Sequence, residues 1–237
     1  MEQIRADCMK QRGFKYVAYV EPKRPEPDLS TYEAMKTYRQ KYGFGVFAQF
    51  VDPKDPLTGS VETASGLDDP NRLIAQKLNA SQLDAYNKAK DGCYGKAVKE
   101  VLHKKADSRL EGLMLQGGAR DDLEEAEING DSELVALIPA FADCLVAKGQ
   151  RVPSAMLPTA MAKRGFDAFW DRLDALGDKE SKGAPRDLTP AQARPYLDRE
   201  IKAALEDLEC GKEFYTRYAP KEASIDARVE AEYGPLF

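Results

Sequence analysis

The stretch that decides the fold is ADCMKQRGFKYV, residues 6–17, because a variant of its pattern, ADCLVAKGQRV, stands at residues 142–152. Each copy has Ala-Asp-Cys, an apolar residue, three further residues and a glycine, followed by a segment expected to be extended. Further along, each copy is followed by a predicted helix with one more cysteine, Cys93 in the first case and Cys210 in the second. Such an internal repeat predicts two related halves.

The repeat also suggests how the four cysteines pair. Cys8, Cys93, Cys144 and Cys210 allow three pairings, and the repeat favours Cys8–Cys93 and Cys144–Cys210, one link between helices in each half. In the chain-entropy model, loops of this length contribute up to about 4 kcal/mol each. The alternative is four reduced, buried cysteines in a cytosolic protein. Two disulfides instead predict a location outside the cytoplasm.

The rest of the chain has mostly helical patterning, so we predict a mainly α fold. Its two disulfide-stapled helical halves are residues 1–118 and 131–237, joined by an acidic connector at 119–130. Residues 14–20 alternate as in a strand, and residues 44–51 form a second aromatic-rich, extended segment; together they predict a small extended or β element in the first half. Gly92 is expected to end one helix shortly before another begins.

Composition excludes several classes of function. The net charge is −5, and the Lys and Arg residues are scattered, so we expect no nucleic-acid partner. No apolar stretch approaches the length of a membrane span. Met1 is followed by charged, helix-like sequence rather than by a signal peptide. We expect that a secretion signal, or a segment with a lipid anchor, precedes this sequence.

The same cysteine motifs resemble those of a family of actinobacterial secreted proteins and lipoproteins. The resemblance covers most of the chain and is carried by motifs of the CM-x3-GF type around the cysteines: Cys8-Met9, Gly13-Phe14, Tyr16, Tyr86, Ala89, Gly92-Cys93, Cys144, Gly149 and residues 203–210. The sequence departs from the family pattern at Gln150, where an aromatic residue is typical. The resemblance implies an extracytoplasmic protein, with no assigned activity, near envelope transport or cell-wall systems.

No residue pattern indicates catalysis or a metal site. The chain has a single histidine, His103, which is expected on a solvated helix face. An EF-hand loop beginning at Glu125 would place Gly130 correctly, but Ala136 would stand where a bidentate glutamate is needed. We therefore predict no catalytic residue, no metal and no cofactor.

The candidate binding surface is a set of aromatic residues in the two extended segments. They could line a ligand groove, or they could form the core of the first half; the set comprises Phe14, Tyr16, Tyr19, Tyr42, Phe44, Phe47 and Phe50. The sequence thus favours a non-enzymatic binding or interaction protein with a protein or peptide partner in the cell envelope. The alternatives are a cell-wall-directed hydrolase that uses carboxylates and an immunity or sequestering protein for a secreted peptide or toxin.

Overall fold

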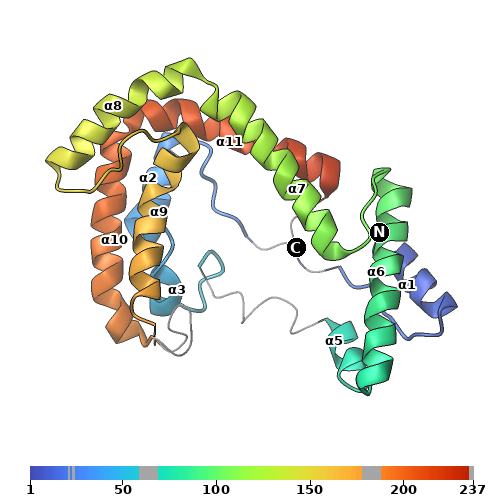
Figure 1. Ribbon diagram of the computed structural model, residues 1–237. Coiled ribbons are helices and arrows are strands. Elements are labelled where there is room, and N and C mark those ends of the chain that lie inside the picture. The colour runs from blue at the N-terminus through green and yellow to red at the C-terminus, as the bar shows by residue number, and fades with distance from the viewer. Residues whose placement is uncertain (21, 23–24, 59–68, 178–187, 235–237) are drawn as a thin grey trace. The chain divides into compact units, whose positions relative to one another are not determined.

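The computed structural model describes residues 1–20, 22, 25–58, 69–177 and 188–234. These residues contain ten α-helices, one π-helical turn and no β-strand (Figure 1). The chain forms two compact units. Unit 1 comprises Met1–Lys23, Val61–Asp121 and Asp226–Phe237, and unit 2 comprises Arg24–Ser60 and Asp122–Ile225. The predicted mainly α class is confirmed, while the predicted division into residues 1–118 and 131–237 stays a prediction.

Unit 1 is built around the first disulfide. Helix α1 (Glu2–Gln11) lies along α6 (Ala80–Leu102), and α5 (Pro70–Ala75) precedes α6 in the chain (Figure 1). The Cys8–Cys93 bond joins α1 to α6. Around it Met9, Tyr86 and Ala89 are buried, and Phe14 packs edge-on against Tyr86. Unit 1 also includes most of α7 (Arg109–Glu124) and the end of α11 (Lys212–Tyr233).

Residues 14–20 do not form the predicted strand. They have no regular secondary structure, and a side chain takes the place of a partner strand. The Asn71 amide accepts a hydrogen bond from the Val17 N–H at 2.8 Å and donates one to the Val17 carbonyl at 2.9 Å. These two bonds satisfy the backbone groups that a β-ladder would pair.

Unit 2 packs its helices around α10 (Pro190–Cys210). That helix contacts α2 (Tyr32–Tyr42), α3 (Ala48–Val51), α8 (Ser132–Ala147) and α9 (Pro158–Asp174) (Figure 1). The π-helical turn η1 (Glu125–Asn129) precedes α8. One buried cluster combines side chains of four helices and the turn before α3: Tyr42, Val46, Phe47, Ala48, Phe169, Leu173 and Leu197. The Cys144–Cys210 bond joins α8 to α10, so the predicted pairing is confirmed for both disulfides.

The second predicted extended segment, residues 44–51, is also not a strand. Gly43 and Gly45 have φ angles of 63° and 97°, which turn the chain after α2, and α3 then begins at Ala48. The backbone donors of this turn point at the Glu200 carboxylate on α10. It accepts hydrogen bonds from Phe44 N–H at 2.9 Å, Val46 N–H at 2.8 Å and Phe47 N–H at 2.9 Å. A strand would have needed these donors for a neighbouring strand.

Gly92 does not end a helix, because α6 continues through it to Leu102. A β-carbon at Gly92 would lie 3.1 Å from the end of the exposed Arg12 side chain. The helix ends instead at His103, which has a left-handed φ of 55°. The helix runs through Gly92 with Ala89, Cys93 and Ala97 buried on either side of it, so the low helix propensity of one glycine does not end it.

Candidate functional site

Unit 2 contains an open groove of about 290 Å³ between α2, the following turn, α9 and α11. Its lining is mostly apolar and aromatic. Its lining includes Met35, Tyr38, Arg39, Phe44, Ala162, Lys163, Phe166, Tyr215, Tyr218 and Glu222. Tyr215 and Tyr218 are almost fully buried and form the floor, whereas Phe166 is 41% exposed and stands at the rim. A pocket of this composition suits a ligand with an apolar body.

Arg39 is the charged residue of the floor. Its guanidinium lies 5.2 Å from the centre of the Phe44 ring and 4.6 Å from that of Tyr215, within cation–π distance of both. Its Nη1 donates to Asp207 Oδ1 at 2.7 Å and to the Ala204 carbonyl at 3.0 Å. Burial alone would lower the pKa of Arg39, but Tyr215 and Asp207 beside it outweigh burial and raise it. The side chain therefore stays cationic.

Asp207 is fully buried and is the centre of a hydrogen-bond network. It accepts from Arg39, from Arg164 Nη2 at 2.9 Å and from the Tyr215 hydroxyl at 2.6 Å. Both arginines are also nearly buried, at 8% exposure each. A buried carboxylate in such contacts keeps its partners in fixed rotamers. The side chains of the groove floor are therefore preorganised for a ligand.

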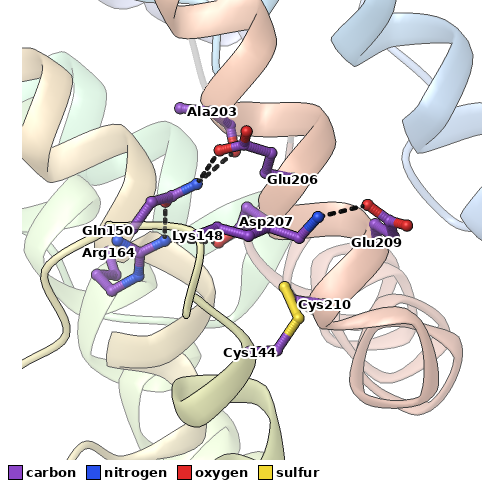
Figure 2. The surroundings of a disulfide bond; sticks show 9 residues. All are labelled: Cys144, Lys148, Gln150, Arg164, Ala203, Glu206, Asp207, Glu209 and Cys210. Carbon is purple, nitrogen blue, oxygen red and sulfur yellow. Dashed lines mark hydrogen bonds and ion pairs between the residues drawn. A yellow bond between two sulfur atoms is a disulfide. The ribbon is translucent and has the colours of Figure 1, made fainter. Parts of the chain in front are cut away.

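Besides its bond to Asp207, Arg164 is held by the loop after α8 (Figure 2). It donates to Gln150 Oε1 at 3.0 Å and to the Arg151 carbonyl at 3.2 Å. The Gln150 amide in turn donates to Glu206 at 3.0 Å and to the Ala203 carbonyl at 3.3 Å, both on α10. Gln150 thus ties this loop to the floor network.

The second disulfide lies beside this network (Figure 2). Cys210 follows Asp207 by one helical turn on α10, and Cys144 fixes the end of α8 against it. One turn beyond Cys144, Lys148 forms an ion pair with Glu209 at 2.9 Å. The covalent link and the ion pair hold in place the loop that carries Gln150.

The phenols of the groove are hydrogen-bond donors at neutral pH. Burial raises the pKa of Tyr38 to about 12. Burial also raises the pKa values of Tyr215 and Tyr218, and the neighbouring Asp207 and Glu222 carboxylates act in the same direction. A phenol that stays protonated at neutral pH is not available as a general base. These groups are therefore suited to contact a ligand rather than to take a proton from it.

The rim carries charge and aromatic surface. Lys163 pairs with Glu124 at 3.4 Å, and Glu222 accepts a hydrogen bond from Tyr218 at 3.1 Å. Phe166 stacks on Trp170, with ring centres 5.8 Å apart and an angle of 18° between the planes. Trp170 is the only tryptophan of the chain, so its fluorescence reports on this rim.

The sequence-predicted aromatic set is distributed over both units. Phe14, Tyr16 and Tyr19 belong to unit 1, where Phe14 and Tyr16 pack against the Cys8–Cys93 cluster. The unit 2 members are core residues or pack against the core: Tyr42, Phe44, Phe47 and Phe50. Of the set, Phe44 lines the groove described above. A binding surface formed by the others stays a prediction.

Sequence reasoning missed Arg39, Asp207 and Glu200, although the sequence contains a signal for them. Buried residues of α2 recur at Met35, Arg39 and Tyr42, with helical spacing. The buried residues of α10 also recur with helical spacing, and Glu200 and Asp207 are among them. They are Ala193, Leu197, Glu200, Ala204, Asp207 and Leu208. A charged residue at an apolar position of an amphipathic helix indicates a buried polar contact.

The structure also bears on the metal, calcium and membrane-span candidates. Within the described residues, no group of three or more His, Cys, Asp or Glu side chains is placed to hold a metal ion. Glu125 begins η1, and Asp131 caps α8, so the acidic stretch is helical rather than a calcium loop. Among the helices of the described ranges, none has the length and apolar character that a bilayer span requires.

No protein-family model, curated protein or solved structure is significantly similar to this chain.

Proposed function

We propose that this protein is an extracytoplasmic, non-enzymatic binding protein that takes its ligand in the groove of unit 2. The observation that carries the proposal is a mostly apolar groove whose floor contains a buried arginine held by Asp207. Specific sites typically combine an apolar lining with a few placed polar groups. Preorganised side chains also reduce the entropy that a ligand must offset on binding.

The fixed carboxylates of unit 2 support binding over hydrolysis. Asp207 is occupied by two guanidinium groups and a phenol, and Glu200 accepts three backbone N–H groups. A carboxylate that acts as an acid or nucleophile must reach its substrate. Both of these carboxylates instead hold the helices and the turn that frame the groove.

The location is supported by the two disulfides. Cysteines persist as disulfides in oxidising compartments and are kept reduced in most cytosols. Alkylation of thiols in intact producing cells, followed by peptide mass mapping, is the test. We expect Cys8, Cys93, Cys144 and Cys210 to escape alkylation until a reductant is added. Full alkylation of all four without reductant would contradict an extracytoplasmic location.

Binding is tested with three probes of one shape and different charge: 4-phenylbutyrate, 4-phenylbutanol and 4-phenylbutylamine. Isothermal titration calorimetry on the full chain should give saturable, 1:1 binding for at least one of them. Ala162→Phe fills the groove and should abolish that binding. Ala168→Phe makes the same change at an exposed position of α9 outside the groove and should leave the binding intact. If none of the three probes binds, or if Ala162→Phe binds as the parent does, the proposed function is wrong.

A further inference from the structure

We infer that the ligand of the groove is a small carboxylate with an apolar body, whose carboxylate lies against Arg39. The inference rests on the proposed function and specifies the chemistry of its ligand. It follows from the charges on the floor, from the geometry of the Arg39 guanidinium and from the order of polar and apolar groups between floor and rim.

Two cations share one carboxylate at the Arg39 end of the groove. Arg39 and Arg164 share the single carboxylate of Asp207, and Tyr215 is a neutral donor to it. Two other acids lie near the groove: Glu200 accepts three backbone N–H groups of the turn after α2, and Glu222 accepts from Tyr218. Buried cations are stabilised by counterions, so an anion in the groove would give Arg39 a second counterion beside the Asp207 that it shares with Arg164.

Arg39 is placed to contact the carboxylate of a ligand. The Phe44 and Tyr215 rings lie near its guanidinium, and both rings line the groove. Arginine has five N–H donors. The two bonds to Asp207 and Ala204 both come from Nη1, and Arg39 also bonds to the Tyr215 hydroxyl; a ligand in the groove, which Arg39 lines, would use the donors that remain. A planar carboxylate fits this planar fork of donors.

Between Arg39 and the rim, the lining of the groove is mostly apolar. Apolar side chains, Met35 and Phe44 among them, would cover the body of a ligand, and Phe166 would cover its outer end. The charges there are those of the Lys163–Glu124 pair and of Glu222. Glu222 would repel an anion, so the carboxylate of a ligand belongs at the Arg39 end and its apolar part toward the rim.

The volume sets the size of the occupant. At about 290 Å³, the groove is near the lower limit of small-molecule sites. A single phenylalkyl or medium alkyl carboxylate is of this size, whereas a folded partner would need a larger and flatter contact. The occupant is therefore a free small molecule.

The three probes separate this inference from the proposed function. On the parent protein, 4-phenylbutyrate should bind at least about tenfold more tightly than 4-phenylbutanol, since a charge-assisted hydrogen bond replaces a neutral one. The amine should bind more weakly than the alcohol. If the alcohol or the amine binds as tightly as the carboxylate, and Ala162→Phe abolishes that binding, the ligand class is wrong while the groove remains the site.

Two arginine variants complete the experiment. Arg39→Met should reduce the affinity for 4-phenylbutyrate to that for the alcohol, with little change for the alcohol itself. Arg199→Met removes an exposed arginine of the same unit that does not line the groove and should change neither. Far-UV circular dichroism establishes whether Arg39→Met is folded. If it is not, the order of the three probes on the parent protein decides the question by itself.

Discussion

Replacing Asp207 with Asn is the most informative perturbation of the floor network. The amide keeps the shape of the carboxylate but has one acceptor oxygen in place of two and no charge. One of the three contacts, which measure 2.6–2.9 Å, then faces an N–H₂ group, and the other two lose the help of the negative charge. Two buried guanidinium groups are left without an anion.

The cost can be worked out from these contacts. Breaking a buried ion pair by removing one partner costs about 3–5 kcal/mol, and hydrogen bonds to charged groups contribute roughly 1.5–3 kcal/mol each. We therefore expect Asp207→Asn to lower the free energy of unfolding by about 3–5 kcal/mol. That is a large part of the roughly 5–15 kcal/mol that a domain has in total.

The matched control lies on the same helix. Asp198 forms an exposed ion pair with Arg194 at 3.0 Å, four residues away. Asp198→Asn should cost about 0.5 kcal/mol or less, because water screens such a pair. Urea unfolding at pH 7, followed by circular dichroism at 222 nm, measures both variants. If the free energies of unfolding of Asp207→Asn and Asp198→Asn differ by less than about 1 kcal/mol, the network does not have the structural role assigned to it.

Three further changes test other parts of unit 2 in the same urea assay. Glu200→Gln should cost about 2 kcal/mol, because one buried N–H group of the turn loses its acceptor; a parent-like value would contradict the role of Glu200 in the turn. Gly165→Ala should cost roughly 1–3 kcal/mol, because the new β-carbon would lie 2.1 Å from the Phe44 ring; no loss would show that the ring moves without penalty. Asp131→Ala should cost about 1 kcal/mol and Asp131→Asn much less, since Asn also caps helices. If both variants lose the same free energy of unfolding, Asp131 stabilises the helix through its charge and not through capping. The hydrogen bond from Lys221 lowers the pKa of Asp131, so its ionic contribution is present above the ordinary aspartate pKa of about 3.9 and is lost as the pH falls through the lowered value. This acid-dependent loss should be absent in Asp131→Asn.

The helices and the disulfides could be predicted from the sequence because their signals are local or repeated. Helical patterning repeats every few residues along one segment, and the ADC motif recurs at Cys8 and Cys144. The error at residues 44–51 has the opposite origin. An apolar, aromatic-rich segment between glycine and proline resembles a strand, but the backbone donors find Glu200, more than 150 positions away in the chain.

The groove was beyond sequence reasoning for the same physical reason. Arg39 and Asp207 are separated by 168 positions, and no short motif relates them. Likewise, the role of Gln150 depends on Arg164, which α9 places against it. Individual charged positions on buried helix faces can be found from the sequence. Their pairing requires the packing of α2, α9 and α10.

Chemical-shift mapping tests the central claim most directly, because it locates the bound ligand without any substitution. ¹⁵N-labelled full-length protein is titrated with 4-phenylbutyrate. We predict that the amide signals of Phe44, Lys163 and Tyr218 shift saturably and more than those of residues in unit 1. The largest shifts at Phe14, Tyr16 and Tyr19, or shifts that rise linearly without saturation, would contradict a binding site in the groove of unit 2.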